Sequence, residues 1–294
     1  MRKRLVVRED DVGYTLAFDL GAFRAIDEGI VTAADVMLDS PHTVEALKWL
    51  RERPWISIGW HRHLWESPVL PPEEVPSLVD EEGRFKWRHR HPELKKEATY
   101  EDAYKELKAE LELCKEVYGR VPDTASLHED GSELDRAMAD VCREYNLNVN
   151  IVRPEKGYPA LMQQNEKFKD IKYYSAIKVL SANLPNGQDS VYDLNYFNDY
   201  QPARTIKNIT WDEDDEIYIT GGHPGYLDDH ILAESRCTLH RCRELQMCID
   251  PEVKQWIIDN KIELVNNRDV MYGTSEYQDH LKEINSPLWI GNMK

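Results

Sequence analysis

Apolar and polar positions follow two different rhythms along the first half of this chain. Short apolar runs, which predict strands, occupy residues 4–7, 30–38, 55–60, 124–127 and 147–152. Longer segments with apolar residues at helical spacing, which predict helices, occupy residues 15–29, 40–53, 99–119 and 132–145. Strands and helices therefore follow one another in turn, which favours a parallel sheet covered by helices.

The second half of the chain is less regular. Residues 154–215 are harder to place, and we assign no element to them from the pattern. Residues 216–220 and 262–265 again predict strands, with helices at about 228–248 and 251–260 between them. The alternation of strand and helix thus resumes before the end of the chain.

The number of strand–helix units narrows the architecture. About seven such units favour a barrel over an open sheet, and barrels of this kind reach this length as one domain. We therefore expect an α/β fold, a single-domain (β/α) barrel over residues 1–294 that is incomplete or distorted. Residues 65–98, rich in Pro, Glu and Arg and without periodicity, predict a loop insertion.

Composition excludes some classes of function. Asp and Glu number 54 against 37 Lys and Arg, a formal charge of −17 that disfavours binding to nucleic acid or anionic membranes. No apolar segment is long enough to span a bilayer, and we expect no signal peptide. The five cysteines are odd in number and scattered, which is typical of reduced thiols in a cytoplasmic protein.

Three consecutive acids, Glu9, Asp10 and Asp11, follow the first apolar run. Carboxylates packed together raise one another's pKa, and a bound cation relieves the repulsion between them. Acids in loops also turn the chain or cap the next helix. The three acids alone therefore fit both a plain loop and a metal site.

Histidines take the same place relative to other predicted strands. His61 and His63 follow the third strand, His128 follows the fourth, and His223 follows the sixth. The carboxyl ends of parallel strands form one rim of an α/β fold, and ligands bind at that rim. We therefore expect these histidines to lie beside the paired aspartates.

Aspartate and histidine at such a rim can hold a catalytic metal ion. One Asp and two His supply three ligands and leave a position for water on a divalent ion. The ion acidifies that water and polarises a carbonyl group, while a second carboxylate accepts the proton. The His–x–His pattern of His61 and His63 could also suggest an amidohydrolase barrel. Such a barrel carries this pattern after its first strand, whereas here it follows the third, which argues against an amidohydrolase.

A series of motifs resembles the YdjC-like carbohydrate deacetylases, the group that contains the chitooligosaccharide deacetylases. The motifs are "EDDVG", "GIVTAADVMLDSP", "SIGWHRHL", "VPDTASLHEDG", "NIVRP" and "GGHPGYLDDHILAESRCTLHRCREL". They cover most of the chain in the family's order. The resemblance implies an incomplete (β/α) barrel that uses a divalent metal to hydrolyse the N-acetyl group of an amino sugar.

The resemblance also implies the metal ligands. Asp11, His61 and His128 would bind one divalent ion. Zinc is the expected metal, with magnesium or another divalent ion as alternatives. One departure lies beside this set. Where the family has the pattern "DSHQH", this chain reads "SLHED", so Ser126 and Asp130 replace an acid and a second histidine.

Catalytic roles follow from the same resemblance. Asp10 would be the general base, His223 would lie opposite as general acid or substrate contact, and Arg153 in "VRP" would orient the base. Val12 replaces the family's aromatic residue. The expected partner is a small carbohydrate substrate, with no nucleic acid and no membrane, and a homodimer is left open.

Two other functions remain open. The altered residues near His128 also fit a catalytically silent relative that binds a sugar or a metal. A metal-dependent amide hydrolase for a substrate other than a sugar would keep the mechanism and change only the pocket.

Three further features could contribute to binding. "CTLHRC", residues 237–242, invites a metal site, but its surroundings predict a helix with buried cysteines. The basic aromatic cluster at 86–91 fits a substrate groove and a solvated loop equally well. Trp60 and Trp65 flank His61, and one of them could stack on a sugar, with core packing expected for Trp60.

Overall fold

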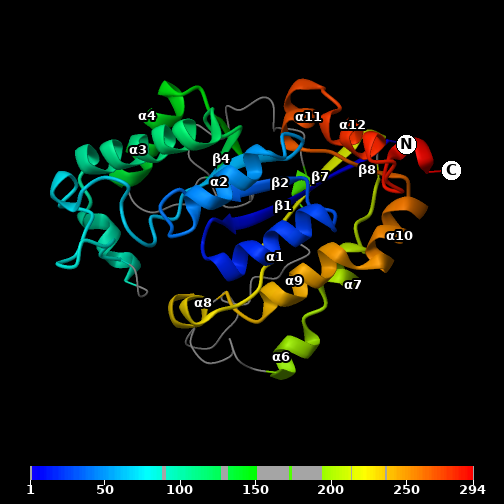
Figure 1. The fold of residues 1–294 in the computed structure, drawn as a ribbon, viewed down its shortest axis with the longest axis horizontal. Coiled ribbons are helices and arrows are strands. Elements are labelled where there is room, and N and C mark those ends of the chain that lie inside the picture. The colour runs from blue at the N-terminus through cyan, green and yellow to red at the C-terminus, as the bar shows by residue number, and fades with distance from the viewer. Residues whose placement is uncertain are drawn as a thin grey trace.

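Parallel strands in the middle of the molecule, with helices packed around them, make up the fold (Figure 1). The computed structural model describes residues 2–87, 91–126, 132–150, 172–173, 194–212, 214–235 and 237–293. Within those ranges eight strands form one sheet, and every paired strand is parallel to its neighbour. The predicted α/β fold class is confirmed, and one domain over residues 1–294 stays a prediction.

The strands are short except for the first and the seventh. They are β1 (Lys3–Val12), β2 (Ala33–Val36), β3 (Ser57–His61), β4 (Thr124–Ser126), β5 (Asn148–Asn150), β6 (Lys172–Tyr173), β7 (Glu216–Gly222) and β8 (Ile262–Leu264). Their order across the sheet is β5-β4-β3-β2-β1-β7-β6, and β8 pairs with β1. Because β1 lies between β2 and β7, residues at its carboxyl end face groups from both halves of the chain.

Helices lie between these strands where the sequence pattern predicts them, and further helices within 194–206 and 267–283 are ones that the pattern does not predict. The helices are α1 (Leu16–Asp27), α2 (Thr43–Arg51), α3 (Tyr100–Tyr118), α4 (Ser132–Glu144), α6 (Leu194–Asp199), α7 (Pro202–Ile206), α8 (Asp229–Glu234), α9 (His240–Ile249), α10 (Pro251–Asp259), α11 (Asn267–Tyr272) and α12 (Glu276–Glu283). In α3, Thr99 caps the start and Gly119, with φ of 102°, ends the helix. No helix of the described ranges is both long and apolar enough to cross a membrane.

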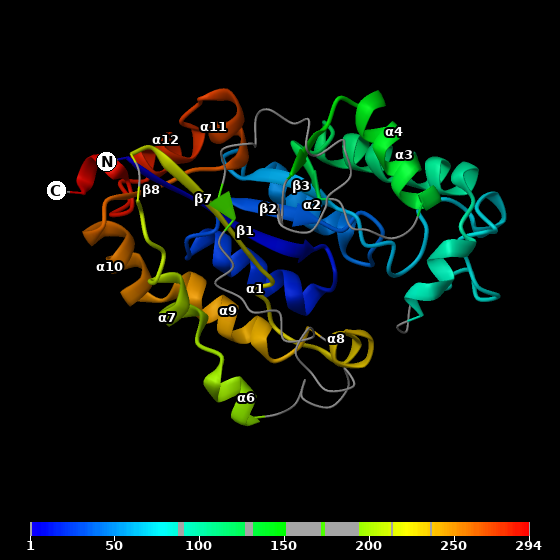
Figure 2. The ribbon, with the colours of Figure 1, turned by 180° about the vertical axis from the view of Figure 1, so that it is seen from behind.

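The helices are distributed unevenly around the sheet. Figures 1 and 2 show α1, α9 and α10 along one side, while α3 and α4 lie at the far end from the two termini. The termini lie close together beside α10 and α12. Apolar side chains of β1 on opposite faces, such as Leu5 and Val6, are buried, as expected for a strand covered on both faces.

The first strand is longer than its apolar run predicts. β1 continues through the three acids to Val12, whereas the sequence pattern puts these acids after the strand. Pairing explains the extension: β7 pairs with β1 as far as Glu9, and β2 pairs with it at Arg8, Glu9 and Val12. The acids therefore lie within a buried strand rather than in an exposed loop.

The helix expected at about 228–248 is in fact two helices. α8 ends at Glu234 and α9 begins at His240. In the break, the backbone N–H of Cys237 donates to Ser235 Oγ over 3.0 Å, a local bond that competes with a helical one. The interpretation of both cysteines of "CTLHRC" as buried helix residues is therefore wrong for Cys237, which lies outside both helices and is half-buried.

Residues 65–98, expected as a loop insertion, connect β3 to α3. Their described part, 65–87 and 91–98, has little regular structure and contains two short 3₁₀ helices, η1 (Pro72–Glu74) and η3 (Pro92–Glu97). The segment nevertheless packs its own apolar side chains, because Phe85 and Trp87 are buried and stack on each other. Trp87, from the basic aromatic cluster, donates its indole N–H to Leu64 O and so belongs to the core.

Candidate active site

An irregularity in β1 places two adjacent aspartates beside the same histidines. In a regular strand, successive side chains point to opposite faces of the sheet. Here the pairing of β1 with β2 changes register between Glu9 and Val12, and Asp11 has a positive φ of 67°. Such a bulge re-aims a side chain. As a result, both Asp10 and Asp11 interact with His61.

The carboxylate of Asp11 lies close to two histidines at the end of β3. Its Oδ1 lies 3.1 Å from His61 Nε2 and 3.5 Å from His63 Nε2. Ligand atoms of these three residues all lie within 4.8 Å of one another. Asp11 and His61 are buried, whereas the His63 side chain is 33% exposed, so the group opens to solvent at His63.

The chemistry of this group fits a divalent cation. A carboxylate oxygen and an unprotonated imidazole nitrogen both present lone pairs, so a proton or a cation is needed between them. Burial lowers the pKa of His61, but Asp11, Asp10 and Asp35 more than offset this effect and raise that pKa overall. The same negative field attracts a metal ion, and Asp–His sets of this kind suit zinc and related metals.

Arg241 of α9 holds the other oxygen of Asp11. Its Nη2 donates to Asp11 Oδ2 over 2.8 Å, and both side chains are buried. Burial alone would raise the pKa of Asp11, but Arg241, His223 and His61 hold it well below its ordinary value. Asp11 is therefore ionised, with Oδ1 directed toward the two histidines. A buried partner that orients a ligand in this way is typical of metal sites.

Asp10 is paired with an arginine that the sequence interpretation did not select. Arg8 donates from Nε to Asp10 Oδ1 over 2.6 Å and from Nη2 to Asp10 Oδ2 over 2.9 Å. This two-pronged ion pair fixes the plane of the carboxylate. Burial raises the pKa of Asp10, but Arg8, His61 and His223 bring it below its ordinary value. Arg153, the predicted partner of Asp10, lies outside the described residues.

Asp35 of β2 is a further acid beside the site. Arg8 Nε lies 3.4 Å from Asp35 Oδ2, and Ser126 Oγ donates to the same oxygen over 2.5 Å. Burial raises the pKa of Asp35, and Arg8 partly offsets that rise. Asp10, Asp35 and His61 form a second group with metal-ligand spacing. Ser126, which departs from the family pattern, thus has a defined hydrogen-bonding role.

His223 lies at the end of β7, as predicted. Its backbone N–H donates to Glu244 Oε2 of α9, and its Nδ1 lies 3.6 Å from the same oxygen. Tyr200 donates its hydroxyl to Glu244 Oε1 over 2.8 Å. Burial disfavours the charged form of His223, but Cys237 and Asp11 more than offset it, so its pKa is well above the ordinary value. The ring therefore lies near Asp11 and is held in its protonated form.

The structure brings together most of the residues predicted for the site. Asp10, Asp11, His61, His63 and His223 share the carboxyl ends of β1, β3 and β7. His128, predicted as the third ligand, lies outside the described residues. Trp60 is a fully buried core residue, as expected, and it also donates to Glu110, while Trp65 packs edge-on against His63.

Four site residues were missed by the sequence interpretation, and each had a weak signal. They are Arg8, Asp35, Arg241 and Glu244. Asp35 is a single charge inside an apolar strand run, and Arg8 directly follows such a run; a charge buried in a strand needs a partner. Arg241 and Glu244 belong to the last of the motifs that carry the family resemblance.

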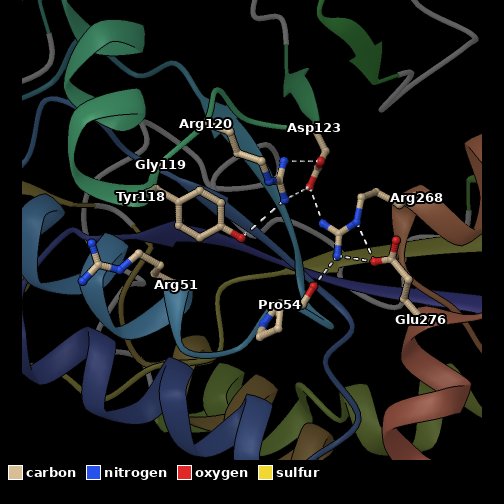
Figure 3. A pocket seen from close by; sticks show the side chains of 8 residues that line it. All are labelled: Arg51, Pro54, Tyr118, Gly119, Arg120, Asp123, Arg268 and Glu276. Carbon is tan, nitrogen blue, oxygen red and sulfur yellow. Dashed lines mark hydrogen bonds and ion pairs between the residues drawn. The ribbon is translucent and has the colours of Figure 1, made fainter.

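A separate pocket of about 640 Å³ lies at the amino ends of β3 and β4, away from these residues (Figure 3). Four of its charged side chains, Arg120, Asp123, Arg268 and Glu276, are joined by ion pairs. Arg120 donates to Asp123, and Arg268 donates to Asp123, to Glu276 and to the carbonyl oxygen of Pro54. These bonds join α11 and α12 to the start of β3 and β4, so we interpret this cluster as structural.

Comparisons with known proteins agree with the motifs. A family model described as YdjC-like protein matches residues 4–259. The chain is 27% identical over 274 residues to a carbohydrate deacetylase of Clostridium beijerinckii, which covers 91% of this chain and 100% of that protein. It is 29% identical over 266 residues to a carbohydrate deacetylase of Brevibacillus brevis, with 89% and 97% covered.

A solved structure supports the fold. A protein of Enterococcus faecalis V583 named for cellobiose-phosphate cleavage superposes with a TM-score of 0.66 at 24% identity, covering 92% of this chain and all of that one. Matches of this extent confirm the resemblance on which the residue assignments depend. The chain belongs to the YdjC-like protein family.

Proposed function

We propose that this protein is a metal-dependent hydrolase that removes an N-acetyl group from an amino sugar or oligosaccharide. The observation that carries the proposal is the convergence of Asp11 with His61 and His63, beside the arginine-paired Asp10. Relatives that match nearly the whole chain carry the name carbohydrate deacetylase, which supports the reaction and the substrate class.

Asp11 and His61, together with His128 or His63, would hold one divalent ion. Zinc is the metal that we propose. When bound, the ion supplies Lewis-acid chemistry: it acidifies water and polarises the acetyl carbonyl group. Two imidazoles and one carboxylate suit zinc better than magnesium, which prefers oxygen ligands. Arg241 keeps Asp11 ionised and oriented for this purpose.

Asp10 would accept the proton of the attacking water. It is ionised, because Arg8 and the neighbouring histidines lower its pKa against the effect of burial. A carboxylate has more lone-pair positions than the two that Arg8 occupies, so a proton can still be accepted. The paired geometry aims the base before substrate arrives.

His223 would donate a proton to the leaving amine. An amine leaves poorly until it is protonated, so a deacetylase needs an acid near its base. His223 is held through Glu244 and lies near both Asp10 and Asp11. Trp65, whose ring lies edge-on to His63 with the ring centres 6.0 Å apart, would pack against a bound sugar ring.

We further propose that the protein acts on a small carbohydrate in the cytoplasm as a single domain, without nucleic acid or membrane partners. The five cysteines are all free, which fits a reducing compartment. The net charge of −17 disfavours anionic partners. The catalytically silent alternative is less favoured, because both Asp10 and Asp11 have buried partners that keep them ionised.

Acetate release from N-acetylated amino sugars tests the proposal. Protein stripped with a chelator should release no acetate, and activity should return when zinc or another divalent ion is added. Asp11→Ala serves as the control, since it should stay inactive at every metal concentration. Full activity after exhaustive chelation would overturn the metal-dependent mechanism, and no release by metal-loaded protein from any N-acetylated sugar would overturn the deacetylase assignment.

A further inference from the structure

Cys237 lies in the break between α8 and α9, close to the candidate active site. Its backbone is fixed: the N–H donates to Ser235 Oγ over 3.0 Å, and the carbonyl accepts from Arg241 Nε over 2.5 Å. The same Arg241 binds Asp11. The position of the thiol is therefore tied to the site through one arginine, while the residue itself remains half-buried rather than enclosed.

The thiol faces positively charged groups. Its Sγ lies 2.7 Å from Nε2 of His240, and it interacts with His223 and Arg241. Of the acids nearby, Glu244 pairs with His223. A sulfur within hydrogen-bond distance of an imidazole and beside a buried guanidinium has the surroundings of a reactive cysteine.

The other four cysteines have different surroundings. Burial raises the pKa of Cys114 and of Cys142 to about 12, and it raises the pKa of Cys248 and Cys242 as well. Burial acts in the same direction on Cys237, but Arg241, His223 and His240 outweigh it and lower its pKa to about 6. Cys242 is half-buried like Cys237 and so provides a matched comparison.

We propose that Cys237 is a modification site: a reactive thiolate that hydroperoxides oxidise, and whose oxidation stops turnover because the sulfur contacts His223. The reactivity of the thiol depends only on its own surroundings. The loss of turnover rests on the proposed function, in which His223 protonates the leaving amine.

The oxidation balances with hydrogen peroxide as the oxidant. The thiolate sulfur attacks one peroxide oxygen, an S–O bond forms and the O–O bond breaks. Two electrons pass from sulfur to peroxide, and the products are the sulfenic acid of Cys237 and hydroxide. A neighbouring imidazolium, that of His240 or His223, gives its proton to the hydroxide, which leaves as water. Excess dithiothreitol should reduce the sulfenic acid back to the thiol.

Alkylation of the wild-type protein tests the thiolate directly. Iodoacetamide at pH 7 should label Cys237 at least about tenfold faster than Cys242, as followed by peptide mass spectrometry, because only Cys237 is mostly ionised there. The rate at Cys237 should level off by about pH 7, while the rate at Cys242 should still rise at pH 9. Equal rates at the two cysteines, or a rate at Cys237 that rises only above pH 8, would overturn the proposal.

Peroxide treatment tests the link to turnover. Acetate release by metal-loaded wild type should fall severalfold with peroxide and recover with dithiothreitol. Cys237→Ser, compared with its own untreated activity, should resist peroxide, and Cys242→Ser should remain as sensitive as wild type. Inactivation of Cys237→Ser at the wild-type rate would overturn the link. An untreated wild type without activity would instead contradict the proposed function, and the labelling result would still decide the reactivity of Cys237.

Discussion

Arg241 and Asp11 are 230 positions apart in the chain, yet Arg241 Nη2 donates to Asp11 Oδ2 over 2.8 Å. This ion pair joins α9 to the end of β1 inside the protein. It leaves Asp11 Oδ1 directed at His61 and His63, the two histidines at the end of β3. The pair therefore fixes the orientation of the carboxylate that we propose as a metal ligand.

Arg241→Met should weaken metal binding. Without the guanidinium, Asp11 loses the partner that orients it, and loss of such a partner lowers metal affinity by about tenfold to a hundredfold. Competition titration with a metal-sensitive dye measures the affinity. Arg243→Met, on the same helix, is the control, because Arg243 donates to Phe197 O and Gln246 rather than to the site. Unchanged affinity in Arg241→Met would show that Asp11 needs no such support.

Substitution of the paired aspartates should separate their roles. Asp11→Ala should lose both the metal and the activity, because a ligand is removed. Asp10→Asn should keep the metal and lose about a hundredfold or more in turnover, since an amide cannot accept the proton. Metal content by elemental analysis and acetate release are measured on the same samples. Equal metal loss in both variants would mean that the two roles are assigned wrongly.

Arg8→Met should lower turnover without releasing the metal. Arg8 pairs with Asp10 and Asp35, whereas Asp11 pairs with Arg241, so the loss of Arg8 should disturb the base rather than the ligand. We expect kcat to fall by about tenfold to a hundredfold with little change in KM, as for a misplaced general base. Arg24→Met, at an exposed position of α1, is the control. A variant of Arg8 with wild-type kcat would exclude it as a positioning residue.

Glu110 should make stability depend on pH. It is fully buried on α3, and Trp60 Nε1 donates to its Oε2 over 2.7 Å. Burial raises its pKa well above the ordinary value, and Asp39 and Glu106 raise it further. The folded protein therefore binds this proton more tightly than the unfolded chain does. The resulting stability is complete below the unfolded pKa of about 4.3 and is lost as pH rises.

Urea unfolding of the metal-free protein measures this effect. The free energy of unfolding of Glu110→Gln minus that of wild type should increase as pH rises from 4.5 to 8. Over this range wild type loses the contribution of protonated Glu110, whereas the amide of the variant does not ionise. Glu116→Gln, on an exposed face of the same helix, is the matched control and should follow wild type. The same pH dependence in wild type and Glu110→Gln would show that Glu110 is ionised in the folded protein.

Much of the fold could be predicted because apolar periodicity marks buried strands and amphipathic helices. The limits of elements were less predictable, since they depend on pairing and on local side-chain bonds. β1 extends through its acids because β2 and β7 pair with it there. The helix expected at about 228–248 is broken because Ser235 bonds the backbone of Cys237.

The candidate site could be predicted in part for a similar reason. Asp11, His61 and His223 stand at strand ends, and the topology of a parallel sheet brings strand ends together. Their partners could not be inferred in this way. Arg8 acts through ion pairs with Asp10 and Asp35, and Arg241 acts through an ion pair with Asp11 across 230 positions. No periodic pattern in the sequence encodes such contacts.

The most direct test of the account is an anomalous-scattering map of crystals grown with zinc. We predict one strong peak about 2.0–2.2 Å from Asp11 Oδ1 and His61 Nε2, with a further histidine and water completing the coordination. That result would establish the ion that the proposed hydrolysis requires, and the map would identify its third ligand. A peak bound to the Asp10 and Asp35 carboxylates without Asp11, or no peak at the ends of β1 and β3, would contradict the account.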